Sequence, residues 1–558
     1  MTLVQGRGLA PRCDWHVIAR GRNAVADYVI VGGGSAGSAL AGRLAEADVG
    51  KVVVLEAGPP DRNPLIHIPA GFVKLLDSKL LYHYKTERQD GLDGRTPIMP
   101  QGAVLGGGGS VNATIYIRGQ RGDYDTWAKL GAIGWSYAEV LPYFRRAEDN
   151  DRFADAYHGT GGPLGVSDLR QITDLTRAFV RSAQEAGIPY SSDFNGARQR
   201  GVGYNQTTTR NGRRCSAAVA YLRPALKTGN LEIRTGCLAT RVLFEGDRAV
   251  GVEYRQNNKL YTVMAEREVI LSGGAIQTPK LLMLSGVGPE GELKRHGIAV
   301  QHRLEGVGRN LQDHLEFPAI RYCTGPYGYF GEDTLMKSAK NGLQYLLFKS
   351  GPVMSNVTEA CAFVNVDDLE EEPNIQLHFV PIVFMDSDQV PIKRAGATVN
   401  PCVLRPQSRG EVRLRSTNPA DDPVIDPKYL SHPDDMRLSI KGLEFARKIL
   451  AQPAFSHFVE RQEAFPGSNA VDEDTLRSYI RSKGKTVYHP VGTCRMGQDE
   501  MAVVDPELRV HGVRNLRVVD NSIMPTLISG NTNAPAIMIG EKASDMIRGI
   551  MPLQPSNA

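Results

Sequence analysis

The sequence predicts an α/β fold that opens with a Rossmann-like βαβ unit and continues into a region of half-buried strands. Two observations support the βαβ unit: an apolar run at 26–31 leads directly into a glycine-rich turn, and a second run at 51–55 ends in an acid. A third concerns residues 374–383 and 410–414, which alternate between apolar and polar side chains. With 558 residues, the chain is long enough for two or more domains.

The glycine-rich turn has the spacing that a dinucleotide requires. Residues 26–31 are rich in β-branched side chains and read as a buried strand, and 35–47 read as a helix. Between them, Gly32, Gly34 and Gly37 satisfy the pattern G-x-G-x-x-G. The first glycine permits the tight turn, the second lets a pyrophosphate approach the backbone, and the third lets the helix pack on the strand. The phosphates are then expected at the helix N-terminus.

The second strand supplies the acid that completes this unit. Lys51–Leu55 reads as a buried strand, and Glu56 follows it directly. A carboxylate at this position accepts hydrogen bonds from a ribose diol, which argues against a 2′-phosphate and therefore against NADP.

Composition narrows the classes of function and partner. Lys and Arg total 65 against 61 Asp and Glu, and the net charge of +4 is dispersed, so we do not expect nucleic acid as a partner. The seven cysteines form no CxxC pair, which argues against a zinc site and fits a reducing compartment. No apolar stretch is long enough to span a membrane. Residues 1–25 lack the apolar core of a secretory signal, so we interpret them as an extension and expect a cytoplasmic location.

Three further regions identify a family. Gly102–Gly119 contains four successive glycines followed by Ser-Val-Asn, and Gly274–Gly288 follows the apolar run 268–271. The third region comprises Tyr488–Gly497 and Val518–Ile537. These regions resemble the two signature motifs and the catalytic carboxy-terminal segment of the glucose–methanol–choline (GMC) oxidoreductases. The first motif departs from the family at Ala103, where Arg or Lys is usual. Within the family, the chain looks most similar to bacterial alcohol dehydrogenases of the L-sorbose dehydrogenase type.

The resemblance implies an FAD-binding Rossmann-like domain intertwined with an α+β substrate domain built on an antiparallel sheet. The implied FAD domain comprises 26–165, 210–315 and 488–552, and the implied substrate domain comprises 166–209 and 316–487. We therefore expect the cofactor to be FAD. The expected cofactor-binding residues are Gly32, Gly34, Ser35, Gly37, Glu56, Ala57, Gly106, Gly107, Asn112, Ala113, Thr114, Ile115, Val242, Gly273, Asp520 and Asn531.

The carboxy-terminal segment contains the expected catalytic pair. By resemblance, His489 is the base that removes the hydroxyl proton, a task that suits a neutral imidazole. Asn531 matches the second catalytic position of the family, and its amide can donate to the substrate oxygen but cannot act as a base. Asn533 is the competing candidate for this second position. We expect the helix after Pro535 to span 536–547 and to direct its N-terminus at the flavin.

Other residues have narrower expectations. Val111 stands where some members carry a histidine bonded covalently to FAD, so we expect dissociable FAD. His314 ends the string Asn-Leu-Gln-Asp-His, and we interpret it as a structural or domain-border residue and not as the base. Arg213 and Arg214 are candidates for holding an anion or for a solvated pair. Residues 322–330 are read either as a loop over the active site or as an ordinary surface loop.

The expected activity is oxidation of a primary or secondary alcohol by hydride transfer to FAD. The resemblance favours a dehydrogenase that uses a quinone or another acceptor, with possible peripheral membrane association. An oxidase that forms hydrogen peroxide and a non-redox hydroxynitrile lyase of the same fold stay open as alternatives. An NAD-linked dehydrogenase and a non-enzymatic flavin protein are further alternatives, and the second signature motif argues against NAD.

Overall fold

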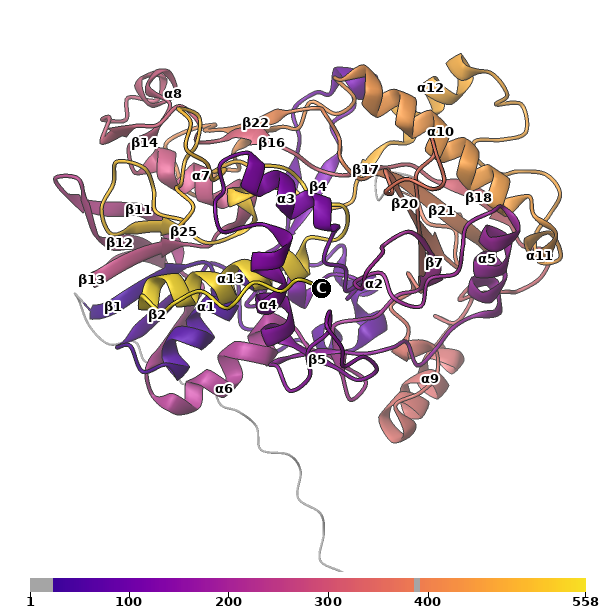
Figure 1. Cartoon of the computed structure of the whole chain (residues 1–558), viewed down its shortest axis with the longest axis horizontal. Coiled ribbons are helices and arrows are strands. Elements are labelled where there is room, and N and C mark those ends of the chain that lie inside the picture. Colours follow the sequence, from indigo (N-terminus) through magenta and orange to yellow (C-terminus); the bar gives the residue numbers. More distant parts are fainter. Residues whose placement is uncertain (1–23, 386–391) are drawn as a thin grey trace, which may run out of the picture.

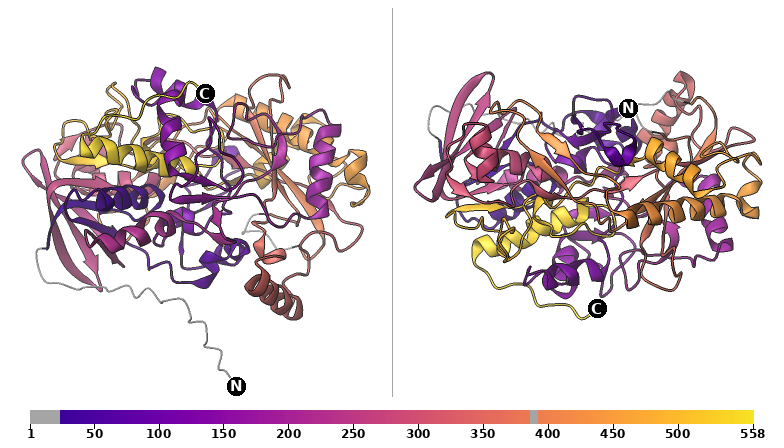
Figure 2. Two further views of the ribbon diagram at one scale, coloured as in Figure 1. Left: turned by 60° about the horizontal axis from the view of Figure 1, so that its bottom comes forward. Right: turned by 90° about the horizontal axis from the view of Figure 1, so that it is seen from above.

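The computed structural model describes residues 24–385 and 392–558, so the predicted amino-terminal extension lies almost entirely outside the described residues. The chain forms two bodies side by side, each built around a seven-stranded sheet, in every view (Figures 1 and 2). Within the described residues, no helix has both the length and the apolar character needed to cross a bilayer.

The first sheet is the predicted Rossmann-like unit with an added hairpin. β1 lies at its centre, in parallel register with β2 on one side and β13 on the other. In sheet order the strands are β10 (Leu231–Thr235), β2 (Val52–Glu56), β1 (Ala24–Val31), β13 (Lys259–Leu271), β12 (Arg248–Gln256) and β11 (Leu238–Glu245), with β25 (Leu516–Val518) also paired to β13. Helices α1 (Ser35–Glu46) and α13 (Asn533–Arg548) pack together beside this sheet.

Two glycines of the predicted motif are needed for the turn itself. Gly32 has a φ of 105°, and a Cβ there would lie 2.3 Å from the carbonyl oxygen of Ser272 on β13's extension. A Cβ on Gly37 would lie 2.1 Å from the carbonyl oxygen of Gly32. Only glycine therefore allows α1 to pack this closely against the strands.

The second sheet is antiparallel. In sheet order its strands are β24 (Lys485–Thr486), β17 (Leu315–Glu316), β21 (Gly396–Val403), β20 (Ile375–Val380), β19 (Ala360–Val364) and β7 (Gly201–Tyr204), with β18 (Ala319–Tyr322) also paired to β21. Leu377 and Phe379 face the apolar core beneath α5 (Asp174–Glu185) and α10 (Pro433–Leu450). The alternate residues Gln376 and His378 face the opposite side, because successive side chains of a strand point to opposite faces.

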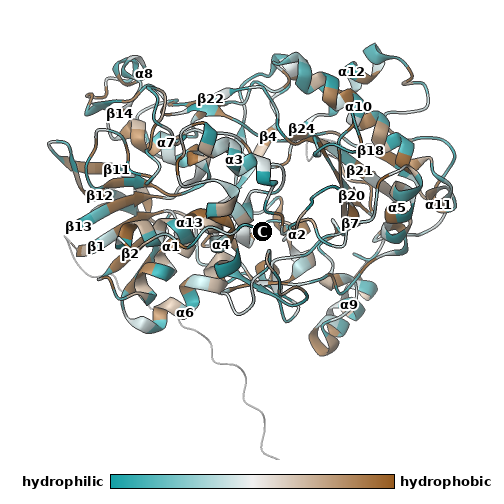
Figure 3. Cartoon of the chain, in the orientation of Figure 1, coloured by the Kyte–Doolittle hydropathy of each residue, from teal (hydrophilic) through white to brown (hydrophobic). Residues whose placement is uncertain are grey.

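Smaller elements complete the two bodies. They include the hairpin of β3 (Leu81–Lys85) and β4 (Ile98–Gly102), the three-stranded sheet of β16 (Arg309–Leu311), β22 (Gly410–Arg413) and β23 (Val424–Asp426), and helices α3 (Arg121–Lys129), α4 (Tyr137–Ala147), α7 (Gly274–Leu284), α9 (Leu335–Phe348) and α12 (Glu473–Lys483). Apolar colour is present in β1, β2 and α9 (Figure 3). The residues of β2 are buried, whereas large apolar residues of α9 are exposed.

Several element ends differ from the sequence-based expectation. α10 begins at Pro433, because His432 accepts a hydrogen bond from the amide of Asp434 and proline suits the first turn. α13 begins at Asn533 and not at 536, which places Pro535 inside its first turn. The strand predicted at 268–271 is the end of the much longer β13, whose first half pairs with β12.

Candidate active site

One cavity of about 370 Å³ lies between the two bodies. One wall comes from the first sheet and its glycine turn, and includes Gly34 and Glu56. The opposite wall comes from the second sheet and includes His378 and Asn400. His489 lines the cavity together with both walls.

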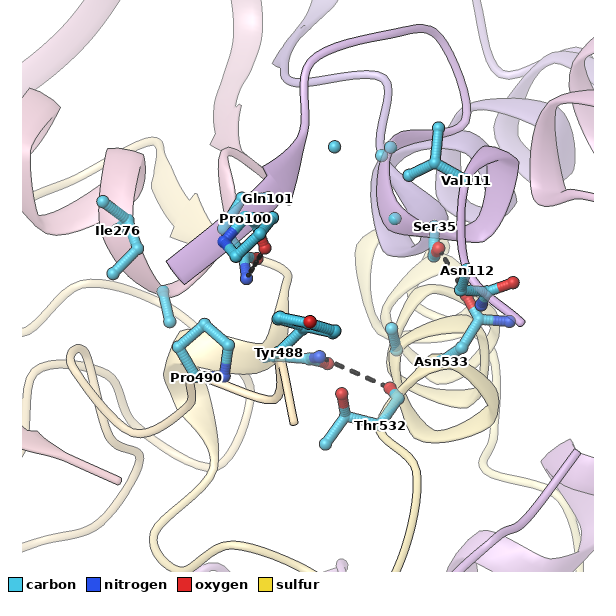
Figure 4. Close-up of a pocket in the computed structure, with 18 of the residues that line it drawn as sticks. Ser35, Pro100, Gln101, Val111, Asn112, Ile276, Tyr488, Pro490, Thr532 and Asn533 are labelled. Atoms are coloured by element: carbon cyan, nitrogen blue, oxygen red, sulfur yellow. Dashed lines mark hydrogen bonds between the residues drawn. The ribbon is translucent and has the colours of Figure 1, made fainter. Parts of the chain in front are cut away.

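The predicted phosphate end has the features that a dinucleotide requires. A Cβ on Gly34 would meet nothing closer than 3.9 Å, so the backbone at the start of α1 opens on the cavity. The carboxylate of Glu56 accepts hydrogen bonds from the amides of Gly33 (2.8 Å) and Gly58 (2.7 Å), which aim it along the cavity. Burial raises the pKa of this carboxyl. The hydroxyl of Ser35 donates to Asn533 Oδ1 (2.7 Å), beside Val111 and Asn112 (Figure 4).

The glycine-rich loop is held in place by a buried arginine. Arg214 donates to the carbonyl oxygens of Ile66, Gly109 and Asn112 and to Asn112 Oδ1, at 2.7–3.2 Å. Arg214 is 2% exposed, and burial lowers the pKa of its guanidinium to about 9. Because its N–H groups donate to these buried oxygens, Arg214 is neither a solvated residue nor an anion site. This corrects the interpretation of Arg214 from the sequence.

Two segments far apart in sequence meet at the remaining part of this wall. Asp520 Oδ2 accepts from the amide of Gly274 and the hydroxyl of Thr278, at the start of α7. Its Oδ1 accepts from the amide of Ser522 at 2.8 Å. Gly273 and Asp520 both line the cavity. A flat dinucleotide with its phosphates at α1 and its ribose at Glu56 fits this set of donors and acceptors.

Most of the predicted cofactor residues line the cavity, and four do not. Those that line it are Gly32, Gly34, Ser35, Glu56, Ala57, Gly107, Asn112, Ala113, Ile115, Gly273, Asp520 and Asn531. Gly37, Gly106 and Thr114 lie behind the wall and shape its turns, with φ values of 88° at Gly106 and 60° at Thr114.

Val242, also among the expected cofactor-binding residues, does not line the cavity. Its amide donates to Ser285 Oγ at 2.8 Å, on the side of β11 that faces α7. Cys237, Leu238 and Ala239 line the cavity instead. β11 begins at Leu238 and runs away from the cavity. Val242 lies three residues beyond Ala239, which is about 10 Å along an extended strand.

Residues 310–314, which precede the second sheet, position the predicted base, His489. Asp313 Oδ1 accepts from the backbone amide of His489 at 2.8 Å, and Gln312 pairs with Val491 through both backbone hydrogen bonds. Tyr488, immediately before the base, has a φ of 69°, a strained value for a residue with a side chain. Asp313 and its string therefore determine where the His489 ring lies.

The ring contacts of His489 assign its tautomer. His314 Nε2 lies 2.9 Å from the carbonyl oxygen of Leu404, which can only accept, so this nitrogen carries the proton. Burial lowers the pKa of His314 to about 4, so its Nδ1 is an acceptor. That atom lies 3.0 Å from His489 Nδ1, which must then donate. Burial, with a smaller effect of His314, lowers the pKa of His489 well below its usual value, so its Nε2 is unprotonated.

The free Nε2 faces the predicted partner. Asn531 Nδ2 lies 3.4 Å from His489 Nε2, and Asn531 Oδ1 lies 3.4 Å from Gln376 Nε2. Asn531 therefore directs an N–H group toward the base, and a substrate hydroxyl between the two can give its proton to Nε2 and accept from Nδ2. Asn533 bonds Ser35 at the first turn of α13, so it does not share this position.

Sequence reasoning missed the functional importance of two residues. His314, predicted to be a structural or domain-border residue, contacts the ring of His489, the predicted base. Arg214, predicted with Arg213 either to hold an anion or to form a solvated pair, instead donates to buried backbone and side-chain oxygens. Residues 322–330, predicted to be either a loop over the active site or a surface loop, do not line the cavity. Cys494 is fully buried, and burial raises the pKa of its thiol well above the usual range.

Comparisons with known proteins agree with this geometry. The family models of the GMC oxidoreductase amino- and carboxy-terminal parts match residues 26–316 and 406–540. The chain is 45% identical over 527 residues to an alcohol dehydrogenase [acceptor] of Pseudomonas putida, covering 93% of this chain and 95% of the relative. It is 45% identical over 535 residues to the mitochondrial choline dehydrogenase of Homo sapiens, covering 94% and 89%.

Solved structures show the same fold. A pyridoxine 4-oxidase from Mesorbium loti superimposes with a TM-score of 0.86 at 31% identity, covering 94% of this chain and 99% of that one. A fungal aryl-alcohol oxidase superimposes with a TM-score of 0.82 at 26% identity, covering 94% and 98%. Family, fold and site together lead to one conclusion: the chain belongs to the GMC oxidoreductases and is an FAD-dependent enzyme that acts on CH–OH groups.

Proposed function

We propose that the protein is a dehydrogenase that oxidises a primary or secondary alcohol to an aldehyde or ketone, with His489 as the base and Asn531 as the donor to the substrate oxygen. Bound FAD supplies the hydride acceptor, its N5 atom. The observation that carries the proposal is the 3.0 Å contact between His314 and His489, because it leaves Nε2 of His489 unprotonated and directed at Asn531. We further propose that a quinone or another carrier, and not oxygen, takes the electrons.

Anaerobic flavin absorbance during mixing with a panel of alcohols tests this proposal. We expect some alcohols to bleach the flavin, and we expect His489→Ala to retain FAD but to lose the bleaching. Admission of air then separates an oxidase from a dehydrogenase. Oxygen rapidly reoxidises the reduced flavin of an oxidase, so its yellow colour returns and hydrogen peroxide forms. A yellow protein that no alcohol bleaches, and that cleaves a cyanohydrin, would overturn the proposal in favour of a hydroxynitrile lyase.

We also propose peripheral association of α9 with an anionic membrane surface. α9 lies at the edge of the molecule in every view (Figures 1 and 2). Its inner side is held by Tyr345, which donates to the carbonyl of Gly212, and by Asn341, which donates to Glu332. Its outer side carries large apolar residues that are 58–87% exposed: Leu335, Met336, Leu343, Leu346, Leu347 and Phe348.

Charge and position favour a lipid surface as the occupant. Lys337, Lys340 and Lys349 flank the apolar row, which suits anionic headgroups. The turn after α9, Pro352–Met354, packs against Pro69–Gly71. Phe72, which follows Gly71, lines the cavity. Docking of α9 would thus bring the cavity close to lipid-soluble acceptors. The described cysteines are free thiols, which supports a location on the cytoplasmic side.

Vesicle sedimentation tests the membrane proposal. We expect binding to phosphatidylcholine vesicles that contain phosphatidylglycerol, and weaker binding when salt is added or when phosphatidylglycerol is left out. Leu343→Glu with Leu347→Glu should abolish binding, whereas Leu260→Glu, at another exposed leucine, should not. Equal binding by all three proteins would refute the role of α9, and a dimer in solution that the α9 variant dissociates would assign the surface to a second copy.

A further inference from the structure

The cavity wall opposite the dinucleotide end carries three polar side chains from three strands. Glu316 on β17, His378 on β20 and Asn400 on β21 all line it. His378 and Asn400 are paired directly across neighbouring strands and are 4% and 1% exposed. Apolar residues such as Val380 and Phe384 surround them. This part of the wall is therefore a small polar area in largely apolar surroundings.

Two of these side chains lack hydrogen-bond partners. Within the part of the chain that the structure describes, neither ring nitrogen of His378 nor Oδ1 of Asn400 has one. The closest carboxylate contact of His378 is Nδ1 to Glu316 Oε2, at 3.4 Å. Buried polar atoms without partners are rare in native proteins, because each costs free energy that a ligand can recover. A hydroxyl group satisfies both residues, since it can donate to Asn400 Oδ1 and accept from a ring N–H of His378.

The charge of Glu316 is already neutralised inside the protein. Lys485 lies directly opposite it in the antiparallel pair of β17 and β24, and its ammonium contacts the Glu316 carboxylate. Both side chains are at most 6% exposed. Burial opposes ionisation of Glu316, but the ammonium of Lys485 is the largest effect that lowers its pKa, to about 2. The pair is thus charged and internally compensated.

The aromatic surface near this pair faces the same ammonium. Lys485 Nζ lies 4.5 Å from the centre of the Phe384 ring and 5.8 Å from that of Tyr488, and both rings line the cavity. A cationic ligand needs an uncompensated carboxylate or free aromatic faces. Here the carboxylate and the rings are already in contact with Lys485, which would also repel a second cation.

We propose that Glu316, His378 and Asn400 form a subsite for a second, uncharged hydroxyl group of the substrate, and that Lys485 makes this subsite reject cationic alcohols. The inference rests on the proposed function, because it specifies the substrate of the same cavity. The substrate class is an uncharged diol or polyol, with the reacting carbon at His489 and the second hydroxyl between His378 and Asn400.

The hydroxyl arm is tested with an alkanediol and the alkanol of the same chain length. The measured quantity is the ratio, between the two compounds, of the second-order rate constant for anaerobic flavin reduction at low substrate concentration. We expect wild type to prefer the diol, and Asn400→Leu or His378→Leu to reduce that preference about tenfold, with the alkanol little affected. Asn400→Ala serves if the leucine variant does not retain FAD. Cys402→Ala, on the same face of β21 but outside the cavity lining, is the control and should keep the preference.

The charge arm is tested with choline and its uncharged analogue, in which carbon replaces nitrogen. In wild type and in Lys485→Arg, the uncharged analogue should reduce the flavin faster than choline does. Lys485→Met should raise the choline-to-analogue ratio about tenfold, because it leaves the Glu316 charge uncompensated. Adding Glu316→Gln to Lys485→Met should cancel that gain. A wild type that prefers choline, or a ratio unchanged in Lys485→Met, would refute this arm.

The failures can be told apart. If no alcohol of either kind reduces the flavin in protein that retains FAD, the proposed oxidation itself fails. If alcohols reduce the flavin but Asn400→Leu keeps the wild-type preference for the diol, only the hydroxyl subsite fails.

Discussion

Replacing His314 with leucine removes the acceptor that holds the Nδ1 proton of His489. In the structure the two Nδ1 atoms are 3.0 Å apart, and both rings are buried. Without His314, the donor on His489 is left unsatisfied, and the ring is free to carry its proton on Nε2, where it cannot act as a base. We expect slower flavin reduction with FAD still bound.

The size of the effect follows from the bond that is lost. An unsatisfied buried donor costs about 1–3 kcal/mol. If that cost is expressed in the transition state, kcat falls by about 5- to 150-fold, at 1.36 kcal/mol for each factor of ten. His314→Gln should recover part of this loss, because its amide can accept from His489 Nδ1 and donate to the carbonyl of Leu404 at the same time.

Steady-state turnover with saturating alcohol and an electron acceptor measures kcat, and stopped-flow mixing measures the rate constant of flavin reduction itself. Flavin absorbance measures the FAD content of each variant. The comparison of leucine and glutamine separates orientation of the base from simple packing. Wild-type kcat in His314→Leu would refute the tautomer argument. Equal impairment of both variants would show that His314 only fills space.

Three further predictions follow from other contacts. The pKa of His489 is lowered well below its usual value, so His489 stays unprotonated as the pH falls. The acid limb of the kcat/KM profile should therefore lie below pH 6.5. An acid limb at or above pH 6.5 would contradict the role of His489 as base. Arg214→Met removes donors to Ile66 and to two residues of the glycine-rich loop, Gly109 and Asn112. This should cost about 2–4 kcal/mol of stability and weaken FAD binding, as measured by thermal unfolding with and without added FAD. Gly32→Ala places a Cβ 2.3 Å from a backbone oxygen at a φ of 105°, so purified protein should contain little FAD, and full FAD content would show that the turn can relax.

The βαβ unit could be predicted because its information is local. Strand, glycine turn, helix and acid follow one another within the segment 24–56, and each has a short-range signal. His489 and Asn531 were found by resemblance, from motifs that surround each residue. Val242 does not line the cavity, because the direction of β11 determines which residues of the strand face it and the sequence does not give that direction.

The sequence by itself determined the family and the cofactor, and it predicts the base, because short motifs carry this information. Only the tertiary structure decided the tautomer of His489, the burial of Arg214 and the pairing of Glu316 with Lys485. His314 and His489 are 175 residues apart, and Glu316 and Lys485 are 169 apart. Charges and protons at a site depend on which groups lie within a few ångströms and on how much water is excluded, and neither is set by neighbours in the sequence.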